Sequence, residues 1–176
     1  MQPWFSTYAV VLYAGTGEHD RHPIVGFDRA LGPITDCNLI EVSSIVPPSA
    51  RVCRMRRGTP RIEAQGFHMP TVYIRADATG QQHATAGIGI GIRPGRTGLI
   101  MPATGASAAG VTGDLADMIE AGMKDRGADD WQMHVAAATT EPIEGHPHLV
   151  RCAVAALCFV ELALWHLFEP HVDTIG

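Results

Sequence analysis

The chain begins with a short run in which consecutive positions are apolar or aromatic. Residues 7–13 read Thr-Tyr-Ala-Val-Val-Leu-Tyr, and a run that is apolar on both faces is typical of an interior strand. A polar, glycine-containing stretch at 15–21 is expected to be a loop. Apolar side chains then recur at helical spacing behind a proline, which predicts a helix over residues 23–31.

The middle of the chain alternates between β-prone runs and stretches rich in structure-breaking residues. An apolar run over 38–45 predicts a strand that ends just before two prolines. The following stretch, 47–65, is rich in proline, arginine and glycine and is expected to be a surface loop. The further strands expected are residues 71–75, 84–92, 98–101 and 131–137.

One expected strand, 84–92, carries glycines on one face and isoleucines on the other. Gly87, Gly89 and Gly91 alternate with isoleucine. Because this pattern has a period of two and opens no helix, it is not a phosphate-binding loop. A face without side chains allows another backbone or a ligand to approach closely.

The strongest helical pattern follows a small-residue loop expected over 103–113. The helix is predicted over about 113–126, with Thr112 as N-cap, acidic residues near its start and basic residues near its end. An apolar stripe marks the face expected to pack on a sheet. That stripe consists of Leu115, Met118, Ile119 and Met123.

The last apolar segment, 149–168, is long enough to cross a membrane but carries charge. Arg151, Glu161 and His166 are costly in a bilayer, so no membrane association is expected. The segment is interpreted as a buried helix or strand, between which periodicity does not decide. Strands over most of the chain, with two helices between them, indicate an α+β protein with helices outside antiparallel sheet layers.

Composition and net charge indicate a globular protein and argue against some classes of function. The 176 residues are 46% hydrophobic and 18% charged, which suits one globular domain. A formal net charge of -5 argues against nucleic-acid binding. The arginines within 51–61 form a local basic cluster, interpreted as a solvated loop, with a phosphate or partner site as the alternative.

The four cysteines and nine histidines show no metal-binding spacing. Cys37, Cys53, Cys152 and Cys158 form no Cys-x-x-Cys pair, and no signal peptide is apparent, so they are interpreted as reduced thiols of a cytoplasmic protein. The densest histidine pair, at 146–148, is interrupted by a proline and has no obvious third ligand. No metal site is expected.

The candidate for chemistry is the pair Ser43-Ser44 near the end of the run 38–45. Pro47 and Pro48 stop the run three residues later, which places two hydroxyl groups in a constrained turn. Strain at a Ser-Ser peptide bond is one route by which a chain cleaves itself. The alternative is an ordinary polar turn.

The residues around this pair carry a resemblance to a known family. The most specific block is 38–48, Asn-Leu-Ile-Glu-Val-Ser-Ser-Ile-Val-Pro-Pro. Further matching blocks are 27–31 (Phe-Asp-Arg-Ala-Leu), 98–101 (Gly-Leu-Ile-Met) and 152–156 (Cys-Ala-Val-Ala-Ala). Over residues 7–166 the chain resembles the pyruvoyl-dependent arginine decarboxylases.

The resemblance implies a proenzyme that cuts itself between Ser43 and Ser44. The Ser44 hydroxyl would attack the Ser43 carbonyl to give an ester, and elimination followed by hydrolysis would leave a pyruvoyl group at position 44. The products would be a small chain of residues 1–43 and a large chain of residues 44–176. The pyruvoyl group serves as an electron sink when CO₂ leaves the substrate.

The resemblance also implies roles for neighbouring residues. Asn38 would polarise the attacked carbonyl, Asp28 would pair with the substrate guanidinium, and Ile45 would contact the substrate. The implied reaction converts arginine to agmatine, or acts on a related cationic amino acid, in polyamine biosynthesis. The implied architecture is a single-domain αββα four-layer sandwich that forms trimers with active sites between subunits.

Two features depart from the family pattern. Family members carry a glutamate, the expected proton donor, directly after Gly-Leu-Ile-Met, where this chain has Pro102. The loop 32–37 is also shorter than in the family, and its Asp36 adds a carboxylate that favours a cationic ligand. Replacement acids, which the sequence does not rank, are Glu41, Asp36, His83 and Glu141.

The functional expectation therefore has alternatives. The first is a self-processing, pyruvoyl-dependent decarboxylase of arginine or a similar amino acid. The second is an unprocessed homologue that acts as a binding or assembly protein. The third is an enzyme of another reaction type in the same fold, which uses Asp28, Asp36 or a histidine without pyruvoyl.

Overall fold

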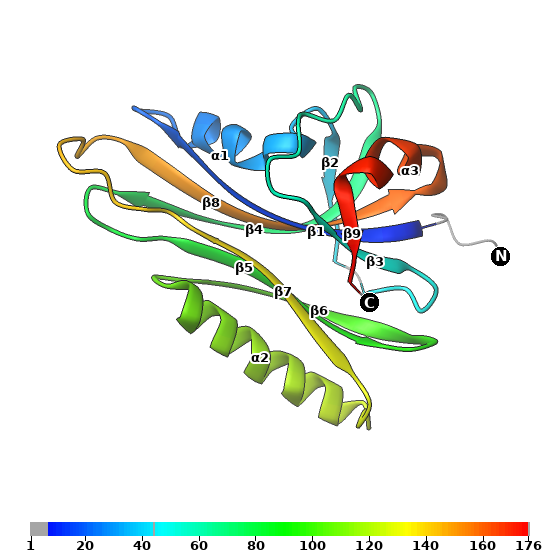
Figure 1. The fold of residues 1–176 in the computed structure, drawn as a ribbon. Coiled ribbons are helices and arrows are strands. Elements are labelled where there is room, and N and C mark those ends of the chain that lie inside the picture. Colours follow the sequence, from blue (N-terminus) through cyan, green and yellow to red (C-terminus); the bar gives the residue numbers. More distant parts are fainter. Residues whose placement is uncertain (1–6, 44, 176) are drawn as a thin grey trace.

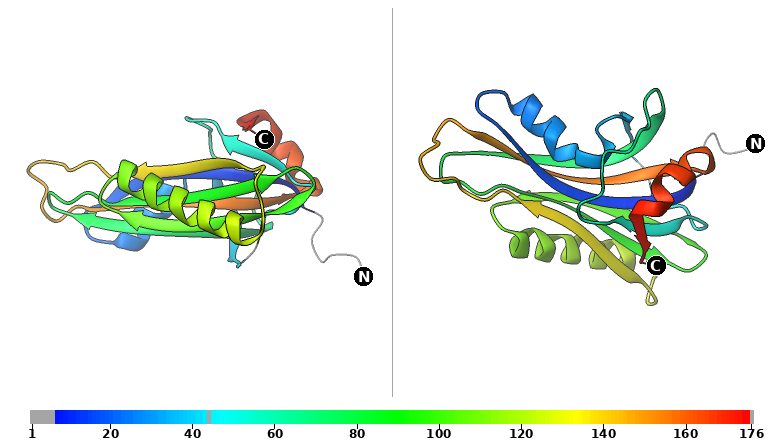
Figure 2. Two further views of the ribbon diagram at one scale, coloured as in Figure 1. Left: turned by 90° about the horizontal axis from the view of Figure 1, so that it is seen from below. Right: turned by 45° about the horizontal axis from the view of Figure 1, so that its top comes forward.

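Two β-sheets stacked face to face form the centre of the molecule (Figure 1). The computed structural model describes residues 7–43 and 45–175. Helix α1 (Pro23–Leu31) covers the outer face of the larger sheet, and α2 (Ala108–Asp125) covers that of the smaller sheet (Figure 2). The expected α+β class and αββα layering are confirmed.

The larger sheet has the strand order β2-β4-β8-β1-β3-β9. In its middle, β1 lies between antiparallel β8 and parallel β3. Its first run is apolar on both faces because Val11 packs in the hydrophobic cluster on one side of the sheet and Val10 and Leu12 pack in the cluster on the other. The strands of this sheet are β1 (Thr7–His19), β2 (Asn38–Glu41), β3 (Arg51–Met55), β4 (His68–Thr79), β8 (Val150–Glu161) and β9 (Val172–Thr174).

The smaller sheet is antiparallel, with the order β6-β5-β7. Its isoleucines, such as the fully buried Ile88 and Ile90, face the larger sheet. Its glycine face receives α2: a Cβ added to Gly89 would lie 2.6 Å from the Cδ1 atom of Ile119. The group that closely approaches the glycine face of this strand is therefore a helix. The strands are β5 (Thr85–Arg93), β6 (Arg96–Gly105) and β7 (Gln132–Thr139).

Short elements complete the outer face of the larger sheet. The helix predicted over residues 23–31 is confirmed as α1, and a 3-10 turn, η1 (Gly32–Ile34), follows it. Near the C-terminus lie α3 (Leu162–Phe168), a second 3-10 turn, η2 (Glu169–His171), and β9. The sequence did not predict α3 and β9, because seven and three residues are too few to establish a period.

Two expected loops contain strands instead. β1 continues to His19, through the expected loop 15–21, because its pairing with β8 extends to Val150. The expected surface loop 47–65 contains β3, which pairs with β1. Conversely, the strand expected over 38–45 ends at Glu41.

The second helix begins earlier than expected. Its N-cap is Ser107, whose hydroxyl accepts a hydrogen bond from the backbone N–H of Gly110 at 3.1 Å. Thr112 lies inside the helix. Met118 is 36% exposed and does not belong to the buried stripe. The buried stripe consists of Val111, Leu115, Ile119 and Met123.

The ambiguous segment 149–168 is mostly strand. From Val150 to Glu161 it forms β8, which is hydrogen-bonded to β4 on one side and to β1 on the other. This central place explains its continuous apolar run. In the described part of the chain, no helix is long and apolar enough to cross a membrane.

Candidate active site

The chain passes from one sheet to the other at the candidate cleavage site. Before the site, β2 runs parallel to β4 with Glu41 opposite Thr71, and the N–H of Val42 donates to the Thr71 carbonyl at 3.0 Å. After the site, Val46 pairs with Gly98 of β6, and the Gly98 N–H donates to the Val46 carbonyl at 2.9 Å. Ser43 is exposed between these two attachments. Ser44 lies outside the described residues.

Helix α1 packs on β4 close to the end of its pairing with β2. In the parallel register of β2 and β4, Glu41 lies opposite Thr71, two residues before Tyr73. The ring of Phe27 packs on Tyr73 with a centroid distance of 5.7 Å. Asp28, the next residue of α1, is exposed. Asp28 therefore lies one residue from the contact that Phe27 makes with β4.

A second carboxylate lies near Asp28 and is paired with an arginine. Asp36, whose side chain is only 11% exposed, forms an ion pair with Arg61. The hydrogen bond to Asp36 raises the pKa of Arg61, and the negative charges of Asp36 and Asp28 raise it further. The loss of surrounding water lowers this pKa, but by less. Asp36 and Arg61, with Glu63 and Gln65, line a cavity of about 460 Å³. The cavity contains more acidic than basic groups.

Asn38 lies at the opposite end of β2 from Ser43. Its backbone N–H donates to the Phe67 carbonyl at 3.0 Å, and it pairs with His68 at the start of the ladder. At about 3.3 Å per residue, the extended backbone separates Asn38 from Val42 by about 13 Å. Within one chain, the structure does not bring the Asn38 amide next to Ser43.

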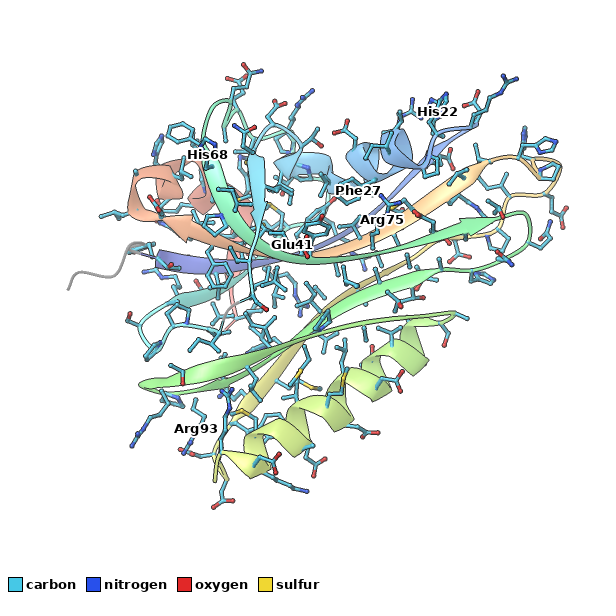
Figure 3. The ribbon with its side chains drawn as sticks, turned by 180° about the vertical axis from the view of Figure 1, so that it is seen from behind. His22, Phe27, Glu41, His68, Arg75 and Arg93 are labelled. Carbon is cyan, nitrogen blue, oxygen red and sulfur yellow. The ribbon has the colours of Figure 1, made fainter. Side chains whose placement is uncertain are left out.

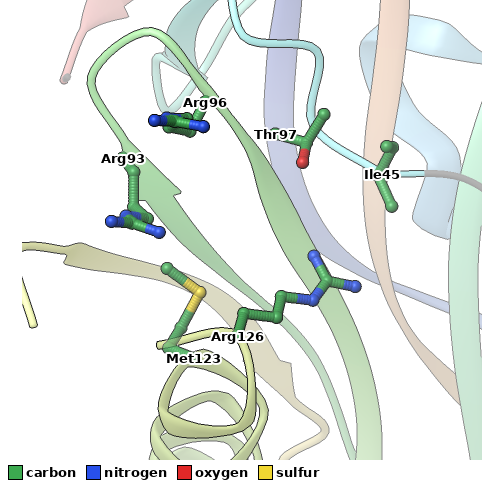
Figure 4. A pocket seen from close by; sticks show the side chains of 6 residues that line it. All are labelled: Ile45, Arg93, Arg96, Thr97, Met123 and Arg126. Carbon is green, nitrogen blue, oxygen red and sulfur yellow. The ribbon is translucent and has the colours of Figure 1, made fainter. Parts of the chain in front are cut away.

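Ile45, on the other side of position 44, borders a cavity rich in arginine. The cavity, about 320 Å³, is lined by Ile45, Arg93, Arg96, Thr97, Met123 and Arg126, and Figure 4 shows these side chains around it. Figure 3 shows Arg93 at the smaller sheet, whereas Phe27, Glu41 and Arg75 lie at the larger sheet. The arginine cavity and the Asp36 cavity thus belong to different layers.

One comparison with known proteins decides the family. A family model described as pyruvoyl-dependent arginine decarboxylase matches residues 9–163, which is most of the 176-residue chain. The chain belongs to this family. The search of curated proteins found no match. The family match includes Asp28, the Ser43-Ser44 pair and position 102.

In this member of the family, Pro102 lies on β6, the strand that pairs with the residue two positions after the candidate cleavage site. Val46 pairs with Gly98 in antiparallel register, so residues before Val46 run alongside residues after Gly98, in the direction of Pro102. Pro102 is exposed and pairs with Ile88 within the smaller sheet. A proline side chain at this position supplies no proton.

The structure separates the four replacement acids into two groups. His83 and Glu141 lie at the Thr85 end of the smaller sheet, where a ring nitrogen of His83 is 3.0 Å from the Thr140 carbonyl. Val46 joins β6 at Gly98, near the other end of the sheet, where the next residue, Leu99, pairs with Gly91 of β5. Asp36 is engaged by Arg61. Glu41 is exposed, at the end of β2 and two residues before Ser43.

The sequence did not predict contacts between residues that are distant along the chain and meet only in the folded protein. Nothing in the sequence links Arg61 to Asp36, or Arg126 to the turn that holds Arg93 and Arg96. Among the described residues, no group of three or more His, Cys, Asp or Glu side chains is placed to hold a metal ion. The four cysteines are all buried and free.

Proposed function

We propose that this protein is a self-processing, pyruvoyl-dependent carboxy-lyase that acts on arginine or a related cationic amino acid. The observation that carries the proposal is the family match over residues 9–163, which includes both serines of the cleavage motif. The expected products of processing are chains of 1–43 and 44–176, with the pyruvoyl group derived from Ser44.

The residues around the motif fit a backbone that is cut at this point. The segment before the cut is anchored by the Val42 hydrogen bond to Thr71, and the segment after it by the Val46 pairing with Gly98. Each new end would retain its own sheet contact. The pyruvoyl group, once formed, supplies the electron sink for loss of CO₂.

The carboxylates near α1 are proposed to bind the cationic end of a substrate that reacts at the cleavage site of a neighbouring copy, because Asp36 lies at the Asn38 end of β2, away from Ser43. Asp36 already holds one guanidinium, that of Arg61, and the charge of Asp28 acts on the same group. A substrate guanidinium presents the same planar set of N–H donors. Binding of arginine in this cavity would therefore displace the exposed Arg61 side chain, which is 62% accessible.

Glu41 is proposed to return the proton to the α-carbon of the product. Of the four replacement acids, Glu41 is exposed at the end of the strand that leads into Ser43, and no described residue forms an ion pair with it. A general acid must reach the reacting atom directly or through one water molecule. Glu41 meets this positional requirement better than His83 or Glu141.

Asn38 is proposed to act on the cleavage site of another copy of the chain. The length of β2 keeps it from its own Ser43, and β2 is an edge strand of the larger sheet. An edge strand is available to a neighbouring molecule. This geometry supports the homotrimer with active sites between subunits, in which one subunit contributes Asn38 to the next.

Intact-mass measurement tests the central proposal. Wild-type protein is expected to yield two fragments, 1–43 and 44–176, with the larger carrying pyruvoyl in place of serine, and to release CO₂ from arginine. Ser44→Ala is expected to remain one chain and to release none, because it lacks the attacking oxygen. A single intact wild-type chain in both fresh and aged preparations would refute the proposal.

A further inference from the structure

Three arginines from two separate elements line the cavity beside Ile45. Arg93 and Arg96 flank the turn between β5 and β6, and Arg126 is the C-cap residue of α2. Figure 4 shows Arg126 extending from the end of α2 toward Thr97, across from the two turn arginines. The Thr97 side chain adds a hydroxyl group to the lining. These side chains line a shared cavity of about 320 Å³.

The positive charge of this cluster is poorly balanced. Among the described residues, the one carboxylate paired with the cluster is Asp130, at 3.2 Å from Arg93, and its side chain is 80% exposed. Such an exposed pair contributes little. In the described part of the chain, Arg96 and Arg126 form no ion pair. The Nε atom of Arg93 is buried without a hydrogen-bond partner among the described residues, so the donors of this guanidinium are not all satisfied by the protein.

An apolar hollow adjoins the arginine cavity. Its volume is about 220 Å³, and it shares Arg93 and Arg96 with the first cavity. Its other walls include apolar groups from two segments. Val46 and Pro47 follow the candidate cleavage site, whereas Ile92 lies near the end of β5 and Pro94 in the turn after it. A ligand with a charged head and an apolar body would fill both spaces.

We propose that the two hollows form a binding site for a phosphate monoester with a small apolar substituent. The phosphate carries up to two negative charges and three terminal oxygens, which suits guanidinium groups arranged around one cavity. The substituent lies against the prolines and aliphatic side chains. A cationic amino acid would be repelled, so this site is separate from the proposed substrate site near Asp36.

The location links the site to the cleavage segment. Ile45 lines the arginine cavity, and Val46 and Pro47 line the apolar hollow. A bound ligand therefore contacts three consecutive residues that follow Ser44. All residues that line the two hollows follow position 44, so they remain on one fragment whether or not the chain is cut.

Calorimetric titration of the full-length Ser44→Ala protein tests the site. Phenyl phosphate is expected to bind at one site per chain, more tightly than inorganic phosphate, which lacks the apolar part, and more tightly than benzoate, which has a smaller charge. Agmatine, a cation, is expected not to compete. Arg96→Gln and Arg126→Gln are each expected to weaken phenyl phosphate binding about tenfold, because each removes charged hydrogen-bond donors.

Arg21→Gln is the matched control, since Arg21 is also exposed and lies beyond the end of β1, outside both hollows. It is expected to leave the affinity unchanged. Equal losses in Arg21→Gln and Arg96→Gln, or no saturable binding of phenyl phosphate, would overturn the proposal. Equal affinity for phenyl phosphate and inorganic phosphate would show that the apolar hollow does not bind the substituent, and would overturn that part of the proposal. Line broadening in ³¹P spectra and melting curves of each variant separate lost binding from lost folding.

Discussion

Glu41 and Pro102 approach the cleavage segment from different sheets. Pro102 belongs to β6 of the smaller sheet, and Glu41 ends β2 of the larger one. The proposed proton donor, Glu41, therefore belongs to the residues that precede the candidate cleavage site. It would remain on the 1–43 fragment after processing.

Glu41→Gln is expected to retain self-cleavage and to lower kcat for CO₂ release at least about 100-fold, because an amide cannot donate the proton. Glu141→Gln is the matched control at the far end of the smaller sheet and is expected to keep wild-type activity. CO₂ release at saturating arginine provides the measurement. Normal turnover by Glu41→Gln would assign the proton to another group.

Buried thiols make the stability of the protein sensitive to alkaline pH. Burial raises the pKa of Cys37 to about 11, and that of Cys158 to about 12, from the ordinary value of 9.0. Above pH 9 the unfolded chain loses these protons while the folded chain keeps them. The free energy of unfolding is therefore expected to fall as pH rises from about 9 toward 11 or 12.

Urea unfolding at about pH 8 and about pH 10 measures this effect, with a lower midpoint expected at the higher pH. The double variant Cys37→Ala, Cys158→Ala is the control and is expected to lose part of the difference. Burial also raises the pKa of Cys152 and of Tyr13 to about 12, and it raises the pKa of Cys53, so these three groups keep the remainder. Equal midpoints for the wild type at both pH values would contradict the prediction.

At the scale of elements, the contact between α2 and β5 depends on the absence of side chains. A Cβ at Gly89 would meet Ile119 at 2.6 Å and the Cβ of Leu115 at 3.3 Å, both on the buried stripe of α2. This stripe and the glycine face have complementary shapes. The period-2 glycine pattern indicated that something would approach the strand, but it did not identify the helix.

Gly89→Ala is expected to lower the free energy of unfolding by about 1–3 kcal/mol, because the added methyl group overpacks this contact. Gly113→Ala is the matched control: a Cβ there meets nothing within 4 Å, and Gly113 lies within α2. It is expected to stabilise the protein by about 0.5–1 kcal/mol. Chemical denaturation of both variants checks the pair, and a neutral Gly89→Ala would show that α2 shifts freely on the sheet.

At the scale of the whole molecule, the two expected fragments are interleaved. Residues 1–43 supply β1, which lies between β3 and β8 of the other fragment. From Ala9 to Leu12, β1 is fully buried. Removing the small fragment would therefore open the centre of the larger sheet and expose both hydrophobic layers.

The processed protein is expected to elute as one species containing both fragments under native conditions. Size-exclusion chromatography followed by denaturing mass spectrometry checks this. Fragments are expected to separate only in denaturant, at concentrations that also abolish the circular dichroism of the sheet. Release of 1–43 from otherwise folded protein would contradict the central position of β1. The mass of the native species also tests the proposed trimer.

Local patterns in the sequence were enough for several elements. The apolar run of residues 7–13, the helix over 23–31 and the alternating strand 84–92 were identified, because each places its period within one element. The Ser-Ser motif with its flanking asparagine and prolines was also visible. Together these patterns predicted the α+β class and the candidate cleavage site, and the resemblance that they carry is the family now matched.

Tertiary structure decided the features that depend on long-range pairing. The segment 149–168 became a strand because β4 and β1 pair with it on both sides, and β3 formed within an expected loop because it adds to β1. The passage of the chain between sheets at Ser43, the pairing of Arg61 with Asp36 and the three-arginine cavity have the same origin. Each of these features depends on segments that are far apart in the sequence. The hydrophobic periodicity within one segment does not indicate which other segment it will contact.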